Sequence, residues 1–407
     1  MTDEIDAAGP WLWVNWLAYS LGYQARDDAR LAGSALLHNV REEYTCFSDR
    51  HVVGTLKFGP YELVPVHGRS TFPGMAHPAL VLRVDDHIPR DQQPMLSEAS
   101  DDLDVERFVS GDLGDQAAWL LSLALGRRFR SWGRTRAALR RDAVGDPETP
   151  FAPQPVLEPD VGIPILPPHE ADPNLADAKL LLTHFSELEA VNAVAVVRSA
   201  RLYSDALWTS RADPAMAWLK LFGALESAAA AWDSTLHETP VEQLKARRPD
   251  LVRALGKLPN DADEAIEIVA KKTSRMMGAE SKLQAFLSAH EPQPPQFRPP
   301  EVACLNYDDL EAPITVLYGH RSAELHGGIP FPPELCTAPH EIDGVPAEIF
   351  SMIAVGGAGG HWPASSLPMY LHTFAHITGE ALRSWWSGLP SRSPTGGESV
   401  LDGAGSS

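Results

Sequence analysis

The sequence predicts an α+β domain that is followed by an all-α helical bundle. In the first third of the chain, short runs of apolar and β-branched residues alternate with turn residues, a pattern typical of strands. After residue 174 the apolar residues recur at intervals of three and four, which is typical of helices that bury one face. Nine prolines lie between Asp146 and Pro173, and a segment so rich in proline favours an extended linker over a helix or a central strand. The expected divisions are residues 1–145 (an α+β domain of unknown role), 146–174 (the linker), 175–387 (the bundle) and 388–407 (a disordered tail rich in Gly, Ser and Pro).

In the first domain, the turn residues Gly59 and Pro60 separate two runs that contain β-branched residues, so we expect a β-hairpin around them. Apolar residues at helical spacing follow Gln116 and predict one helix that continues to Arg141. The expected elements are Trp11–Tyr19 (a strand or a short helix), His51–Phe58, Tyr61–Val66 and Ala79–Val84 (strands) and Gln116–Arg141 (a helix).

The second domain is expected to be helical throughout. Asp213-Pro214 and Pro313 fit helix starts, because proline is tolerated in the first turn. The expected helices are Leu175–Leu207, Asp213–His237, Pro240–Leu255, Asp261–His290, Pro313–His326 and Pro363–Trp386.

Composition excludes several classes of protein. Hydrophobic residues make up 44% of the 407 residues, as in a globular protein, and no run of 18 apolar residues predicts a membrane-spanning helix. The acidic start of the chain argues against a signal peptide, and three widely spaced cysteines fit reduced thiols, so we expect a cytoplasmic protein. The net charge of −20 argues against non-specific coating of nucleic acid, but a local basic site is compatible with it.

One such basic segment lies at the end of the expected helix Gln116–Arg141. Seven arginines fall between Arg127 and Arg141, with Phe129 and Trp132 among them. Arginine and aromatic residues together can hold phosphates and stack bases, which predicts an RNA-binding stripe, and a solvated helix face is the alternative. The candidate RNA-binding residues are Arg127, Arg128, Arg130 and Arg134.

The candidate catalytic residues lie at the end of the expected helix Pro313–His326. Arg321 and His326 bracket four residues, and Gly327-Gly328 then ends the helix. Arginine is a permanent cation that binds phosphate, and histidine can move a proton near neutral pH. These two functions suffice to cleave RNA without a metal. Residues five apart lie about 140° apart around a helix, however, so the two side chains are splayed.

The same stretch resembles the R-x4-6-H motif of HEPN domains (higher eukaryotes and prokaryotes nucleotide-binding), and of the ApeA-like members in particular. Their motif helix reads roughly Y-x-x-R-S/N-x-x-x-H-G, and Tyr318, Arg321, Ser322, His326 and Gly327 match it. The resemblance covers about Ala176 to Trp386 and implies that the bundle is HEPN-like.

The resemblance also implies a function and roles for single residues. It implies a metal-independent endoribonuclease of the toxin or antiviral-defence type, with no cofactor, RNA as substrate, and a site shared across a homodimer. His326 would transfer the proton, Arg321 would bind the scissile phosphate, and Glu226 on an early helix would face the motif, with a helix-surface glutamate paired with a neighbouring base as the alternative. Ser322 would orient the phosphate or His326, with an ordinary helix serine as the alternative, and Tyr318 is expected only to pack. The alternative function is a non-catalytic HEPN-like module that binds or scaffolds a partner.

A competing interpretation is a metal-dependent hydrolase. His372, His376 and Glu380 are spaced by four residues, which places them on one face of a helix where they could ligate a metal ion. The spacing lacks the glutamate of the zinc-protease motif, and hydrogen bonds inside the bundle are the simpler role for these side chains. The expected resident metal is therefore none.

Overall fold

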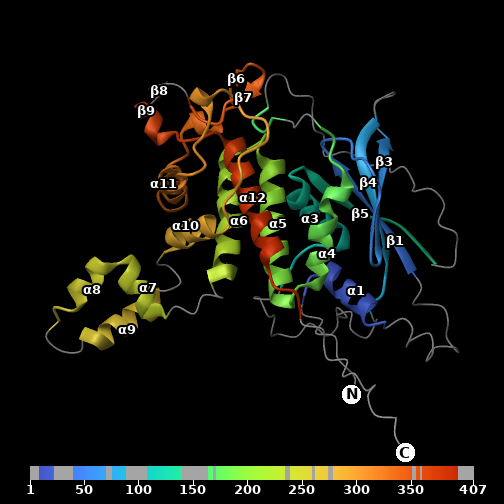
Figure 1. The fold of residues 1–407 in the computed structure, drawn as a ribbon, viewed down its shortest axis with the longest axis horizontal. Helices are drawn as coiled ribbons and strands as arrows, with labels where there is room; N and C mark the ends of the chain where they lie inside the picture. Colours follow the sequence, from blue (N-terminus) through green and yellow to red (C-terminus); the bar gives the residue numbers. More distant parts are fainter. Residues whose placement is uncertain are drawn as a thin grey trace, which may run out of the picture.

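The protein consists of an antiparallel sheet and a larger, mostly helical part (Figure 1). A computed structural model describes residues 9–22, 40–69, 76–88, 108–139, 164–167, 171–233, 239–258, 262–273, 278–350, 354–357 and 360–392. In the part of the chain that is described, no helix combines the length and the apolar character needed to cross a bilayer.

The sheet has five strands in the order β2-β3-β4-β1-β5, and every neighbouring pair is antiparallel. Its inner face is apolar, with Cys46 and Leu80 among the fully buried residues, and it packs against α1 and α3, as Figure 1 shows. A capping box at Asp112 and Asp115 starts α3, and Gly126, whose φ of 63° is left-handed, ends it. These elements are β1 (Val40–Ser48), β2 (Leu56–Phe58), β3 (Tyr61–Arg69), β4 (Ala76–Asp85), β5 (Phe129–Leu139), α1 (Trp11–Ser20) and α3 (Leu113–Leu125).

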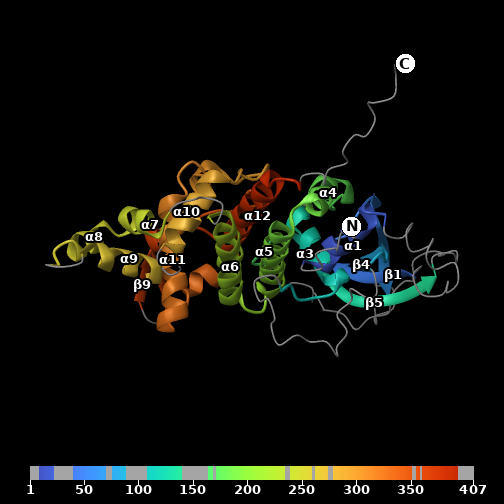
Figure 2. The same cartoon turned by 90° about the horizontal axis from the view of Figure 1, so that it is seen from below.

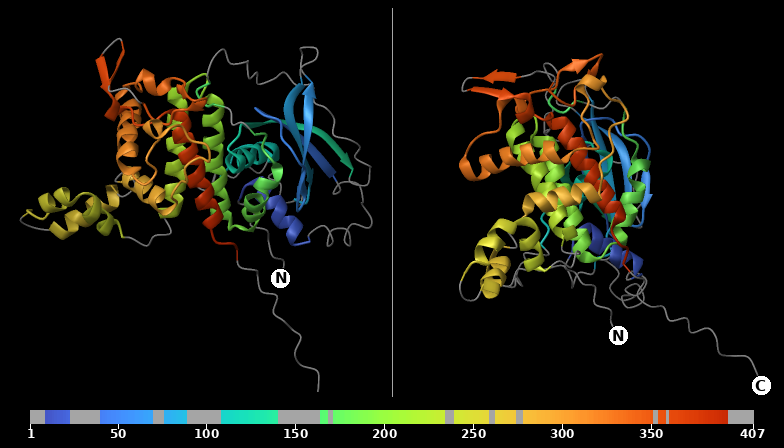
Figure 3. Two further views of the ribbon diagram at one scale, coloured as in Figure 1. Left: turned by 45° about the horizontal axis from the view of Figure 1, so that its top comes forward. Right: turned by 60° about the vertical axis from the view of Figure 1, so that its left-hand side comes forward.

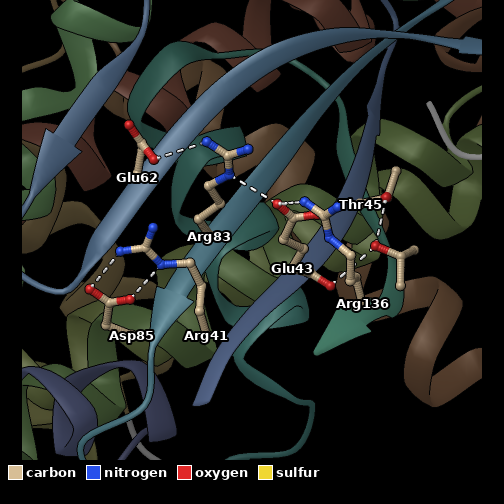
Figure 4. A network of polar contacts seen from close by, with 8 residues as sticks. Arg41, Glu43, Thr45, Glu62, Arg83, Asp85 and Arg136 are labelled. Carbon is tan, nitrogen blue, oxygen red and sulfur yellow. Dashed lines mark hydrogen bonds and ion pairs between the residues drawn. The ribbon is translucent and has the colours of Figure 1, made fainter. Parts of the chain in front are cut away.

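The opposite face of the sheet carries a network of charged side chains (Figure 4). Glu43 alternates with core residues along β1 and is only 2% exposed. Its carboxylate accepts hydrogen bonds from Arg83 Nε at 2.9 Å and from Arg136 Nη2 at 2.8 Å, and these arginines lie on the neighbouring strands β4 and β5. Arg83 also reaches Glu62 on β3 at 3.4 Å. The buried carboxylate therefore links β1 to both of its neighbours, β4 and β5.

The helices continue away from the sheet in successive layers, which Figure 2 shows as α3, α5 and α6 side by side. Helix α12 lies against α6, α5, α3 and α4. The buried rings of Trp218 and Phe222 on α6 pack against Phe374 on α12, with centroids 5.0 and 4.6 Å apart. These elements are a 3-10 turn (Leu175–Ala178), α4 (Lys179–Glu187), α5 (Ala190–Thr209), α6 (Pro214–Asp233) and α12 (Leu371–Gly388).

The remaining elements lie beyond α6. Helices α10 and α11 pack on α6, and two short hairpins lie at the end of the bundle where α12 begins (Figures 1 and 3). Helices α7, α8 and α9, residues 239–273, form a separate projection that we call the α7–α9 arm. The bounds are α7 (Pro240–Arg247), α8 (Pro249–Leu255), α9 (Ala262–Thr273), α10 (Ala279–Ala289), α11 (Glu311–Gly327), β6 (Glu341–Ile342), β7 (Val345–Pro346), β8 (Ala354–Gly357), β9 (Gly360–Pro363) and 3-10 turns at Glu301–Ala303, Pro333–Cys336 and Ala364–Ser366.

The prediction of one helix over Gln116–Arg141 is wrong. The helix ends at Leu125, because Gly126 takes the left-handed conformation, and Arg130, Arg134 and Arg136 lie on the edge strand β5. Strand β1 was not expected, although it is the centre of the pairing with β4 and β5. The expected hairpin around Gly59-Pro60 and the strand Ala79–Val84 are confirmed as β2, β3 and β4.

The expected long helices are broken where local backbone geometry interrupts them. Leu175–Leu207 divides at Leu188 and Glu189, which are extended. Pro240–Leu255 divides at Arg248, whose conformation is set by the proline that follows it. Asp261–His290 contains the separate helices α9 and α10, and α12 begins only at Leu371, after Pro368. The second part is mostly helical rather than all-α, since it also contains β6–β9.

The expected domain division stays a prediction. One hydrophobic cluster contains Phe129 and Leu120 from before the proline-rich segment and Ala200 and Tyr203 from after it. Most of residues 146–174 and most of the tail 388–407 lie outside the described residues. The end of the proline-rich segment is held by the first part, because Val53 N–H donates to Pro173 O at 3.0 Å.

The buried carboxylate of the sheet makes a first prediction. We expect Glu43→Gln to lower the free energy of unfolding by about 3 kcal/mol, because removing one member of a buried ion pair leaves the other uncompensated. Glu62→Gln is the matched control. The Glu62 side chain is 34% exposed and lies 3.4 Å from Arg83, and exposed ion pairs contribute about 1 kcal/mol or less. Urea unfolding measures both variants, and equal losses would contradict the role given to Glu43.

Candidate functional site

Helix α11 carries the Arg321–His326 motif and ends directly after it. Gly328 has a φ of 62°, the left-handed conformation that glycine adopts without strain. Gly328 N–H donates to Glu324 O and Ile329 N–H donates to Ala323 O, both at 3.2 Å, so the last turn is closed by backbone bonds. The motif therefore lies at a well-defined helix end.

The structure brings Arg321 together with Glu226 of α6. Arg321 Nη2 donates to Glu226 Oε2 at 2.6 Å, and the two side chains are 17% and 20% exposed. Tyr318 donates its hydroxyl to the other carboxylate oxygen at 3.1 Å, and the Arg321 guanidinium lies 5.3 Å from the centre of the Tyr318 ring. Burial, and then the nearby Glu226 carboxylate, raise the pKa of Tyr318 to about 12, so its hydroxyl remains a donor. The three side chains form a half-buried, charge-assisted cluster.

Packing on α6 explains why Glu226 meets the motif. Leu225 and Ala224 are fully buried, so α6 is held in one rotation about its axis. One turn before Glu226, the Phe222 ring contacts the Tyr318 ring edge-on with centroids 5.8 Å apart. Residues three and four apart share a helix face, so Phe222 and Glu226 present an apolar and an acidic group to the same part of α11.

His326 does not join this cluster. It is exposed at the end of α11, and within the described part of the chain no hydrogen bond or ion pair holds its imidazole. Its neighbours Leu325 and Ile329 are also exposed, at 49% and 57%. Ser322 is half-buried and likewise makes no hydrogen bond to a described residue. One subunit thus presents a fixed arginine and a separate, accessible histidine.

The four candidate RNA-binding arginines are largely committed to contacts within the protein. Arg128 Nε donates to Leu207 O at 2.8 Å, and Arg127 Nη2 donates to Ala171 O at 3.2 Å. Burial lowers the pKa of Arg127. Arg134 forms an ion pair with Glu42 at 2.5 Å, and the Arg130 guanidinium lies over the Trp208 ring at 5.2 Å. Arg127 and Arg128 are therefore held within the protein, whereas Arg130 is exposed and Arg134 is 57% exposed in a surface ion pair.

The alternative metal ligands have other partners. His376 Nε2 lies 2.8 Å from Gln293 O, and Glu380 forms an ion pair with Arg383. His372 Nε2 lies 3.4 Å from Thr373 Oγ1. Among the residues that the structure describes, no group of three or more His, Cys, Asp or Glu side chains could hold a metal ion.

Sequence reasoning missed the second role of Tyr318. The residue packs on Phe222 as expected, but its hydroxyl also binds Glu226. The signal was present in the sequence, because Tyr318 precedes Arg321 by three residues and therefore shares its helix face.

Comparisons with protein-family models, with curated proteins and with solved structures give no match to this chain. The site must therefore be interpreted from its own geometry.

The surroundings of His376 make a second prediction. Burial lowers the pKa of this imidazole in the folded protein. A histidine with a folded pKa below its unfolded value of about 6.5 stabilises the fold above that pH, and the stabilisation is lost as the pH falls, because the unfolded chain binds the proton more readily. The free energy of unfolding of the unaltered protein should therefore fall more steeply between pH 7 and 5 than that of His376→Gln. Urea unfolding across this range measures the slopes, with the exposed His51→Gln as control, and equal slopes for the His376→Gln variant and the parent would contradict the account.

Proposed function

We propose that the protein is a metal-independent endoribonuclease of the toxin or antiviral-defence kind, with an HEPN-like bundle. The observation that carries the proposal is the 2.6 Å contact between Glu226 on α6 and Arg321 on α11. An acidic residue on an early helix that faces the motif arginine is what the resemblance to HEPN domains implies. The accessible His326 at the end of α11 would supply the second group that the chemistry requires.

The chemistry follows from the properties of the two motif side chains. His326 takes the proton from the 2′-hydroxyl of RNA, and the oxygen attacks the adjacent phosphorus. The bond from phosphorus to the 5′-oxygen breaks, a protonated histidine returns a proton to that oxygen, and a 2′,3′-cyclic phosphate remains. Arg321 offsets the charge that develops on the phosphate oxygens. Glu226 binds Nη2 of the guanidinium, and the other N–H groups of its planar fork are suited to a phosphate.

A symmetric dimer would complete the site. Arg321 and His326 of one subunit lie about 140° apart around the helix and cannot easily face one phosphate together. A twofold axis near the end of α11 would place the histidine of one subunit opposite the arginine of the other. The exposed Leu325 and Ile329 next to His326 provide apolar surface for such a contact.

The second candidate function is a non-catalytic module that binds or scaffolds a partner. The ion pair between Arg321 and Glu226 supports this function as well, because the same contact would stabilise the packing of α11 on α6 in a protein without catalysis. Substitution of His326 distinguishes the two functions, because a scaffold has no need of its imidazole.

The proposed function makes a third prediction. His326→Ala and Arg321→Ala should each lower the rate of RNA cleavage by about a hundredfold or more, since positioned proton transfer and charge stabilisation each contribute roughly this much. Cleavage of a labelled RNA is measured with purified full-length protein. The exposed His51→Ala is the matched control and should cleave like the unaltered protein.

The same assay separates the proposed mechanism from metal chemistry. Cleavage should survive EDTA and should leave 2′,3′-cyclic phosphate ends, because the attacking group belongs to the RNA. Full activity of His326→Ala would reject the proposal. Loss of activity together with stoichiometric zinc on chelation would instead favour a metal-dependent hydrolase.

A further inference from the structure

The α7–α9 arm is a separately packed extension of the bundle. Its buried residues Leu244, Ile266 and Ala270 form a hydrophobic cluster of their own, distinct from the cluster of the bundle. Figures 1, 2 and 3 show the arm projecting away from the helices. The arm therefore adds none of its described residues to the buried cluster of the bundle, and any binding role must lie in its exposed surface.

One segment of the arm, residues 245–257, is locally basic in an acidic protein. It contains five Lys and Arg but a single Asp, whereas the whole arm, residues 239–273, contains seven Lys and Arg and six Asp and Glu. Lys245, Arg248, Arg253 and Lys257 are all exposed. Exposed charges act over about 8 Å at physiological ionic strength, so this segment forms a local positive surface, although the arm also exposes Asp263, Glu264 and Glu267 on α9.

The arm's cations are only partly neutralised by its own acids. Arg253 forms an ion pair with Asp250 at 3.2 Å, and the side chains of Arg253 and Asp250 are 71% and 88% exposed. Such an exposed pair is weak, so an external anion can replace Asp250. Glu242 accepts hydrogen bonds from the N–H and the hydroxyl of Thr239 at 2.8 and 2.7 Å, and its carboxylate also interacts electrostatically with Lys245. Within the described residues, Lys245, Arg248 and Lys257 form no ion pair. These cations are therefore available to an external anion.

The arm lies between two helices of the bundle along the chain and on the same side of the bundle as the motif helix. It connects α6, which carries Glu226, to α10, which packs against both α6 and the motif helix α11. Figures 1 and 2 both show it on the side of the bundle where α10 and α11 lie. A long anionic chain bound to the arm could therefore extend toward α11.

The composition of the arm indicates what it can recognise. Residues 239–273 contain no Phe, Tyr or Trp. Unpaired bases commonly stack on aromatic rings, and the arm offers none, so phosphates are the part of an RNA that its cations suit best. Lysine and arginine instead bind phosphates, with a strong dependence on salt and little on sequence.

We propose that the α7–α9 arm binds the phosphate backbone of the RNA substrate without reading its bases. The proposal rests on the ribonuclease function proposed above and names the surface that holds the substrate. It adds a second candidate surface to the arginine-rich segment around β5, in which Arg127 and Arg128 are bound to backbone carbonyls within the protein.

The test measures binding rather than cleavage. In a His326→Ala background, which keeps the RNA intact, the affinity for a fluorescein-labelled single-stranded RNA is measured by anisotropy from 50 to 200 mM salt. We expect Lys245→Gln/Lys257→Gln to weaken binding by about tenfold and to reduce the slope of log affinity against log salt by about 1.4, since each phosphate contact to single strands contributes roughly 0.7. Two RNAs of different sequence should behave alike.

Lys57→Gln/Lys179→Gln is the matched control, because it removes two exposed lysines from the sheet and from α4 and changes the net charge equally. Equal losses in the two double variants would overturn the proposal, and so would an unaltered protein that binds anionic phosphatidylserine vesicles but no RNA. Salt-dependent binding through the arm by a chain that never cleaves RNA would support the arm and reject the ribonuclease. If the arm substitutions change neither the cleavage rate nor the affinity for RNA, the ribonuclease is supported and the role of the arm is rejected.

Discussion

The interaction on which the candidate site depends is the ion pair between Glu226 and Arg321. A guanidinium that is 17% exposed loses much of its hydration, and the carboxylate at 2.6 Å, which also accepts from Tyr318, compensates for that loss. The pair fixes one face of the arginine and with it the rotation of α11 against α6. His326 is then presented at the helix end by geometry alone, because Gly328 closes the last turn behind it.

The rest of the fold holds these two helices in place. The buried rings of Trp218, Phe222 and Phe374 lock α6 against α12, and α5 continues the same core to α3 and the inner face of the sheet. On the outer face, Glu43 and its two arginines connect three strands. Of the arginine-rich segment, Arg136 takes part in this attachment and Arg127 and Arg128 bind backbone carbonyls, whereas Arg130 and Arg134 are exposed.

Local patterns predicted the elements that depend on local chemistry. The turn at Gly59-Pro60 gave the β2–β3 hairpin, and apolar spacing located α6, α11 and most of α12. The helix prediction failed after Leu125. The apolar spacing of α3 continues in the sequence to Phe129, but the left-handed Gly126 ends the helix and redirects the chain into β5. Strand β1 was missed because Glu42 and Glu43 interrupt its apolar pattern, and their partners on β4 and β5 are distant in sequence.

The site could be anticipated only in part for the same reason. The spacing of Arg321 and His326 is visible in the sequence, but the meeting of Arg321 with a residue 95 positions earlier is not. Glu226 was chosen through a family resemblance, which supplies three-dimensional information that spacing lacks. The engagement of Arg127 and Arg128 by backbone carbonyls depends on tertiary packing and could not be read from their clustering.

The central claim is that an arginine of one subunit acts with a histidine of the other, and subunit complementation tests it most directly. Arg321→Ala and His326→Ala proteins are each assayed alone and then after mixing under conditions that exchange subunits. A mixed dimer contains one site with an intact Arg321 from one chain and an intact His326 from the other, so we expect mixing to restore cleavage that neither variant shows alone. Two inactive variants that form mixed dimers, detected by differently tagged chains, and yet remain inactive would contradict the account.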